Sequence, residues 1–201
     1  VDFYSEDRLD GNRAILKGMT ADYDKFMSQA KKDKDGNILN LITINGLDSS
    51  NLEVIGKQLQ RMAKGERTDG KYKEIGAIYG FPIKVVSETS FESGLPFVDN
   101  RFVVEGHYKY QYNNGHIAKS DPIAAANNFV NALQKIQGYI EQYDSRCRTL
   151  EKEIPQLQEI ASKVWKREDE LKSLKAELAA LDRKIQLELA PPVPEKDISD
   201  K

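Results

Sequence analysis

The chain has 201 residues, of which 39% are hydrophobic and 31% charged, and its 30 basic and 32 acidic side chains give a formal net charge of -2. This length is sufficient to bury one sizeable core, or a core with a helical extension. The charge balance lacks the overall positive field of non-specific nucleic-acid binders, so any contact with DNA has to be local.

Cysteine usage and hydropathy indicate the compartment. Cys147 is the only cysteine, which excludes an internal disulfide and a multi-cysteine zinc site. The longest apolar stretches fall far short of the ~20 residues of a membrane helix, and the N-terminus has no signal-peptide pattern. We therefore expect a cytoplasmic protein with no membrane partner. Because the chain starts at Val1 and ends in an open, charged segment, we also expect a fragment of a larger protein.

The first predicted element is a helix over residues 5–31, which Ser5 can cap and in which apolar residues recur at helical spacing. The segment KKDKDGN then ends it. This segment resembles a calcium loop superficially, but placing Gly36 at the sixth position puts Lys31 at the first and Ile42 at the twelfth, where acidic ligands are required. No metal or other cofactor is predicted.

Residues 40–65 predict a strand, a turn at Asn45-Gly46 and a second helix. Ser50 and Glu53 fit a reciprocal capping box at the start of that helix. An apolar stripe then follows at helical spacing, consisting of Leu52, Ile55, Leu59 and Met62.

Strand patterns dominate the next part of the chain. Residues 74–88 predict two short strands or one bent strand, with Pro82 at an edge or a bulge, and residues 89–97 predict a loop. Residues 101–112 alternate in a single phase, so either one long strand breaks at Gly106 or a hairpin turns there.

A helix is predicted from Asp121, as cap, and Pro122, as first helical residue. The order of elements favours an α+β fold in which helices flank a small antiparallel sheet and a long, coiled-coil-like helical tail follows. We expect the α+β domain to cover residues 1–145, the helical extension residues 146–189 and a flexible tail residues 190–201.

The extension carries a heptad pattern of apolar residues. Pro155 is expected to kink the helix or start a new one. Of two arrangements, a break within residues 163–167 that produces a helical hairpin is favoured over one continuous rod. Pairing with a second copy is left open, because a parallel dimer would make two attractive charge pairs and one repulsive pair. The predicted heptad seam consists of Leu150, Leu157, Val164, Leu171, Leu174, Leu178, Leu181 and Ile185.

The sequence contains no recognisable catalytic constellation. His107 and His116 each stand alone, without a carboxylate pattern of the HExxH type. Arginines flank Cys147, but no histidine is near it in sequence, so a structural thiol is the better interpretation. We therefore expect a non-catalytic chain.

Two groups of residues are candidates for contact with nucleic acid. Tyr108, Tyr110 and Tyr112 alternate as in the platforms on which single-stranded bases stack, with Arg101 and Lys109 available for phosphates, although packing in a core is the favoured interpretation. On the second predicted helix, one face presents Lys57, Arg61 and Lys64, which suit DNA phosphates, although a solvated surface is favoured over DNA contact.

Three stretches together carry a family resemblance: IGAIYGFPI, FVVEGHYKYQYNNGHIAKSDPIAAANNFVNALQKI and KREDELKSLKAELAALDRKIQLEL. They resemble the C-terminal region of large DNA methylase and helicase proteins of bacterial conjugative elements. The family's catalytic motifs are absent, and SDPIAA lacks the second proline and the aromatic residue of the methylase motif. The resemblance implies an accessory module of a DNA-processing protein, which contacts DNA or docks to other domains of the parent protein. The alternative is an assembly module that pairs through its heptad helices without touching nucleic acid.

Overall fold

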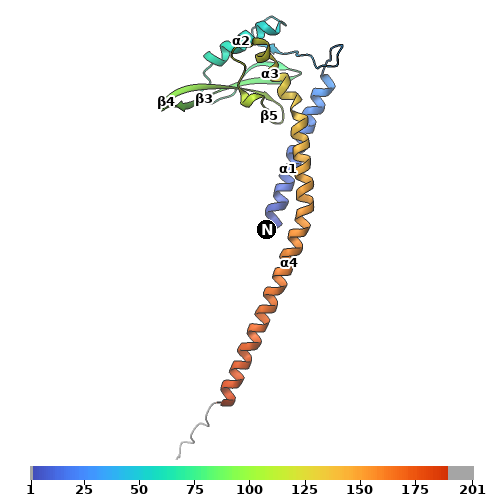
Figure 1. The fold of residues 1–201 in the computed structure, drawn as a ribbon, viewed down its shortest axis with the longest axis vertical. Helices are drawn as coiled ribbons and strands as arrows, with labels where there is room; N and C mark the ends of the chain where they lie inside the picture. The colour runs from blue at the N-terminus through green and yellow to red at the C-terminus, as the bar shows by residue number, and fades with distance from the viewer. Residues whose placement is uncertain (1, 190–201) are drawn as a thin grey trace, which may run out of the picture. The chain divides into compact units, whose positions relative to one another are not determined.

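The computed structural model describes residues 2–189 (Figure 1). The described part of the chain divides into two compact units, one formed by residues 8–149 and the other by residues 2–7 with residues 150–189. The predicted α+β class is confirmed: helices accompany one antiparallel sheet, and a long helix ends the described part of the chain. The tail predicted over residues 190–201 lies outside the described residues.

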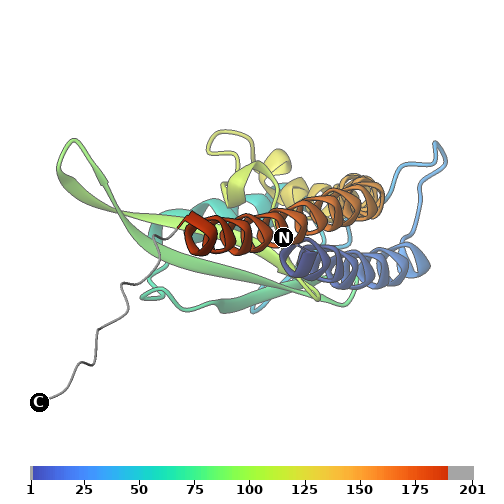
Figure 2. The same ribbon diagram turned by 90° about the horizontal axis from the view of Figure 1, so that it is seen from below.

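The sheet has five strands in the order in which they follow along the chain, and every neighbouring pair is antiparallel. Its long central strands run side by side in both ribbon views (Figures 1 and 2). The strands are β1 (Thr43–Ile44), β2 (Lys73–Ile78), β3 (Phe81–Glu92), β4 (Leu95–Glu105) and β5 (Lys109–Tyr110).

The prediction of a loop over residues 89–97 is wrong, because β3 and β4 continue through it and meet in a two-residue hairpin. Ser93 and Gly94 form the turn with φ values of 51° and 79°, the conformation that matches the twist of paired strands. The sequence did not predict this turn, because serine is less frequent than asparagine or aspartate at the first turn position of a two-residue hairpin. Pro82 pairs with Ala77 of β2, and the pairing of β3 with β4 begins only at Ile83. No hydrogen bond to β4 is therefore lost because Pro82 has no N–H.

Of the two alternatives for residues 101–112, the hairpin is correct. β4 ends at Glu105, and β5 returns antiparallel to it, with Val104 opposite Tyr110. The chain turns at Gly106, whose N–H donates to the carbonyl of Tyr108 at 2.8 Å. The three tyrosines therefore do not share one strand.

Local capping determines where two helices begin. Helix α2 (Leu52–Gly65) is capped by Asn51, whose Oδ1 accepts the N–H groups of Glu53 at 2.9 Å and Val54 at 3.3 Å. The predicted cap at Ser50 is thus wrong by one residue, because asparagine caps as well as serine and its oxygen reaches both N–H groups. Helix α3 (Pro122–Gln134) begins as predicted, with Asp121 accepting the N–H of Ala124 at 3.0 Å.

The core lies where helices cover the sheet. Helices α2 and α3 lie side by side against one face (Figure 1), and Phe102 of β4 meets Phe129 of α3 edge-to-face at 6.1 Å between ring centroids. Helix α1 (Asp2–Gln29) contributes Phe26, whose ring lies 5.4 Å from that of Tyr79. All of these aromatic side chains are buried, so hydrophobic burial holds the three helices to the sheet.

The close approach of α2 to α3 depends on Gly56, where a Cβ would overlap the carbonyl of Pro122. Gly56→Ala should therefore lower the free energy of unfolding by about 1–3 kcal/mol, although alanine is the better helix former, because the helices must separate. Urea unfolding followed by circular dichroism measures the change. Gly65→Ala is the matched control, since nothing lies within 4 Å of the position that a Cβ would take there; an equal loss in both variants would contradict this account of the packing.

Helix α4 (Ile136–Leu189) is continuous over 54 residues, and Lys135, which joins it to α3, is itself in helical conformation. The favoured break within residues 163–167 is therefore wrong. This segment, KVWKR, contains neither glycine nor proline, and an interruption of a heptad pattern does not interrupt a helix. Pro155 lies inside α4 and does not start a new helix.

Candidate functional site

The side chains of the heptad seam are buried at the start of the seam and exposed farther along α4. Leu150 is buried and Leu157 is half-buried, and near them Gln158 Nε2 donates to Glu6 Oε1 of α1 at 3.0 Å. Farther along α4, large apolar side chains are exposed. Their exposed fractions are 49% for Val164, 51% for Leu171, 62% for Leu174, 61% for Leu178, 56% for Leu181 and 50% for Ile185. The apolar stripe in this part of α4 is therefore open.

The basic face of α2 forms a second surface. Lys57, Arg61 and Lys64 line a shallow hollow of about 210 Å³ together with Gln60, whose amide donates to the carbonyl of Ala118 at 2.9 Å. Lys57 also pairs with Glu53 at 2.6 Å. The structure thus brings together the three cations that the sequence placed on one helical face.

The two other candidate phosphate contacts lie among carboxylates. Arg101 Nε is 3.1 Å from Asp99 Oδ2 and 3.9 Å from Glu88 Oε2. Lys109 Nζ is 3.5 Å from Glu105 Oε1 and lies over the ring of Tyr72. A phosphate at either cation would compete with carboxylates already in place.

The three predicted tyrosines occupy three environments. Tyr110 is 3% exposed and belongs to the core, whereas Tyr108 is half-buried against that core. Tyr112 is 36% exposed, and its ring lies 4.9 Å from Lys135 Nζ. The favoured interpretation of a core thus holds for Tyr110, applies in part to Tyr108 and does not apply to Tyr112.

A pocket of about 260 Å³ collects two of these tyrosines with two others that sequence reasoning missed, Tyr139 and Tyr143 of α4. The latter two recur at a four-residue spacing, which places them on one face of a helix. That spacing was the available signal, but it does not show which strand the face meets. The pocket lining consists of Met19, Tyr108, Lys109, Tyr110, Gln111, Tyr139 and Tyr143.

The buried carboxylate of Asp22 binds Tyr110, which lines this pocket, and holds the turn between β4 and β5. Its Oδ2 accepts the hydroxyl of Tyr110 at 2.6 Å and the backbone N–H of His107 at 2.7 Å, and its Oδ1 lies 2.7 Å from His107 Nδ1. Burial, followed by the hydrogen bond to Asp22, raises the pKa of the Tyr110 hydroxyl above its usual value. His107 is therefore paired through a partner that is distant in sequence.

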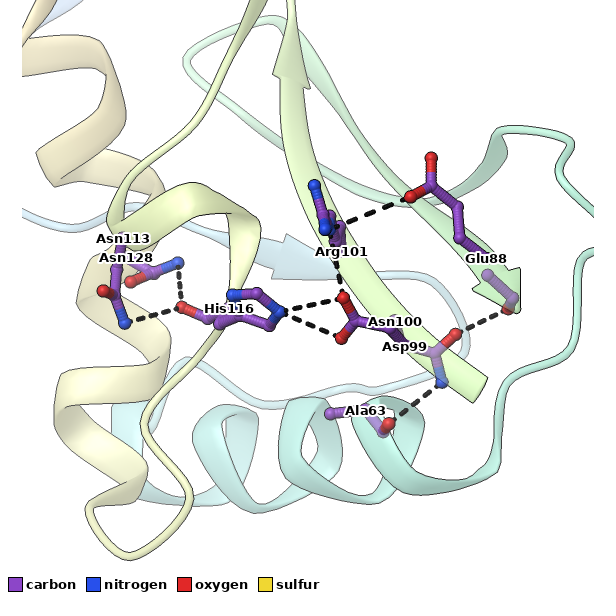
Figure 3. A network of polar contacts seen from close by, with 9 residues as sticks. Ala63, Glu88, Asp99, Asn100, Arg101, Asn113, His116 and Asn128 are labelled. Atoms are coloured by element: carbon purple, nitrogen blue, oxygen red, sulfur yellow. Dashed lines mark hydrogen bonds and ion pairs between the residues drawn. The ribbon is translucent and has the colours of Figure 1, made fainter. Parts of the chain in front are cut away.

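His116 also has a carboxylate partner, in the polar network of Figure 3. Its Nε2 lies 2.9 Å from Asp99 Oδ1, while its carbonyl accepts the Asn128 amide of α3 at 3.2 Å. Asn100, which follows Asp99 in β4, donates to the carbonyl of Ala63 in α2 at 2.9 Å. These contacts tie β4 to α2, to α3 and to the loop that carries His116.

Asp99 should make stability depend on pH. Burial raises the pKa of its carboxyl, but hydrogen bonds from Arg101 and His116 outweigh this effect and hold the pKa below its usual value. The stabilisation is therefore present above the unfolded-state pKa of about 3.9 and is lost as the pH falls through the lower folded-state value. Thermal melts over this range should show that Asp99→Asn reduces the acid-dependent loss of stability. An identical pH profile for the variant would contradict this role.

The segment KKDKDGN, for which the sequence analysis predicted no metal, forms a turn that Asp33 stabilises. Asp33 Oδ1 accepts the N–H groups of Asp35 and Asn37, both at 2.9 Å. Within residues 2–189, no group of three or more His, Cys, Asp or Glu side chains is placed to hold a metal ion. In the same range, no helix combines the length and the apolar character needed to cross a bilayer.

A family model described as a domain of unknown function, DUF8438, matches residues 27–133, which is more than half of the chain. No curated protein and no solved structure matches. The matched range contains all five strands with α2 and most of α3, and it ends before α4.

Proposed function

The chain belongs to the DUF8438 family, and we propose that it is a non-catalytic assembly module in which the open seam of α4 pairs with α4 of a second copy. The observation that carries the proposal is the exposure of Leu171, Leu174, Leu178 and Leu181, each more than half exposed at heptad positions of one continuous helix. Such a stripe is stabilised when the equivalent stripe of another helix removes it from water.

A second copy is the proposed partner because the seam and its flanks largely complement themselves. In a parallel pair, Lys163 would face Glu168 and Glu170 would face Lys175 of the other copy, while Glu177 would face an aspartate. Arg167 occupies a core position of the stripe, and a polar residue at such a position fixes the register at a cost in stability.

The setting of this module is part of the proposal. The resemblance to the C-terminal region of DNA methylase and helicase proteins of conjugative elements supports a place in a cytoplasmic DNA-processing protein. Pairing of the modules would bring two copies of such a protein together on their substrate. The match to the family model adds no activity to this picture.

Sedimentation equilibrium of the chain over a range of concentrations tests the assembly. We expect the average mass to rise from the 22.8 kDa of one chain towards twice that value, with little dependence on salt, because the interface is mainly apolar. A mass that stays at one chain at every concentration would rule out self-assembly.

Contact with DNA through α2 is the second candidate function, favoured by the convergence of Lys57, Arg61 and Lys64 on one hollow. Fluorescence anisotropy of labelled duplex DNA would show binding that weakens with salt. Replacing the three cations with alanine should reduce the slope of log affinity against log salt by about 0.9 for each phosphate that is no longer neutralised. The control removes the same charge from an exposed loop, at Lys31, Lys32 and Lys34. If the two triple variants weakened DNA binding equally, the effect would come from net charge, and specific contact through α2 would be contradicted.

A further inference from the structure

The pocket lined by Tyr108, Tyr110, Tyr139 and Tyr143 is not used by α4 pairing or by the basic face of α2. We infer that this tyrosine pocket binds one unstacked base of a single-stranded nucleic acid. Aromatic side chains that accept a base in this way recognise its flat π-face and tolerate different base sequences.

The size and lining of the pocket favour a single flat ring. Its volume of about 260 Å³ lies below the ~300–1,000 Å³ of pockets that hold a whole small-molecule ligand. Four of its seven lining residues are tyrosines, and Gln111 adds an amide with both donors and an acceptor for the edge of a base.

Aromatic pockets can also bind cationic groups. The charges around this pocket favour a nucleic-acid base over such a cation. The described lining contains Lys109 and no carboxylate. The guanidinium of Arg146 lies 5.0 Å from the ring centroid of Tyr143, one of the lining residues. A cationic ligand would meet no carboxylate in this lining. Lys109 is already 3.5 Å from Glu105 Oε1, so Arg146 is the cation that would meet a phosphate flanking the base.

Two of the rings are held in place before any ligand arrives. Tyr110 is fixed by its hydrogen bond to Asp22 at 2.6 Å. Tyr108 packs against Gly18 of α1, where even a Cβ would come within 2.7 Å of Tyr108 Cε2. Rings that are already ordered lose little conformational freedom on binding, which favours affinity.

Binding of short fluorescein-labelled oligothymidylate and oligouridylate to the full chain, measured by anisotropy, tests the inference. The critical comparison strand carries abasic sites along the same sugar–phosphate backbone. We expect both base-containing strands to bind more tightly than the abasic strand. Equal affinity for the abasic strand would overturn the pocket and leave contact through α2 intact, because that contact depends on phosphates alone.

Variants assign the effect to the pocket. Tyr139→Ala and Tyr143→Ala should each weaken binding roughly 5- to 150-fold, whereas Tyr139→Phe and Tyr143→Phe should retain it because the ring remains. Tyr112→Ala, which removes an exposed tyrosine outside the pocket lining, is the control and should bind as the unaltered chain does. Alanine and phenylalanine variants that bind alike would contradict stacking, as would tighter binding of a proline-rich peptide than of either oligonucleotide.

Discussion

Replacing Leu174 and Leu178 with lysine should keep the chain monomeric at concentrations at which we expect the unaltered chain to pair. Each leucine is more than half exposed in the single chain, so burying it in a helix pair is worth about 1 kcal/mol, roughly half the value for a fully exposed side chain. Four such residues per pair then contribute about 4 kcal/mol, which corresponds to a roughly thousand-fold rise in the dissociation constant when they are replaced. Sedimentation equilibrium of the double variant measures this change.

The control for this experiment introduces the same charges on the same helix, away from the seam. Ala176 and Ala179 are exposed and lie outside the heptad core positions. Ala176→Lys with Ala179→Lys should leave the dissociation constant nearly unchanged and preserve the helical signal. If both double variants dissociate equally, net charge and not the apolar seam controls the association.

Asp22→Ala should cause a large loss of stability in the compact unit of residues 8–149. The substitution leaves the Tyr110 hydroxyl and the His107 N–H without their acceptor, at about 1–3 kcal/mol for each donor. We therefore expect the free energy of unfolding to fall by about 2–6 kcal/mol, and the β4–β5 turn to exchange its amide hydrogens faster. Chemical denaturation and hydrogen exchange measure the two effects.

Asp24→Ala provides the comparison, because Asp24 is an exposed carboxylate of the same helix. Its substitution should change the free energy of unfolding by less than about 0.5 kcal/mol. Adding Tyr110→Phe to Asp22→Ala should recover part of the loss, since the buried hydroxyl that has no acceptor is then removed. A loss as large in Asp24→Ala would show that helix charge, and not the buried network, explains the effect.

Local signals in the sequence predicted much of the secondary structure. Asp121 followed by Pro122 marked the start of α3 because capping depends only on neighbouring residues. The Ser93-Gly94 hairpin was missed because its turn residues are atypical. The break in α4 was predicted wrongly from an irregular heptad pattern. Such a pattern indicates which face of a helix packs against another helix, and an irregularity in it does not show that the helix ends.

The candidate sites depend on contacts that sequence patterns do not contain. Tyr110 is separated from Asp22 by 88 positions, so nothing in the pattern around either residue predicts their hydrogen bond. His116 was likewise expected to stand alone, although Asp99 lies 17 positions before it. The heptads predicted an apolar stripe, but its exposure beyond Leu157 depends on where α1 meets α4.

Disulfide trapping at the seam tests the central claim most directly. A mixture of Leu171→Cys and Leu174→Cys chains should form a covalent dimer under mild oxidation, with like pairs dominating in the proposed parallel arrangement. Ala176→Cys, on the opposite side of α4, and the unaltered chain with its buried Cys147 give the background. Rapid, concentration-dependent trapping only at seam positions is the predicted result. Trapping no faster than at Ala176→Cys would contradict pairing of two copies through α4.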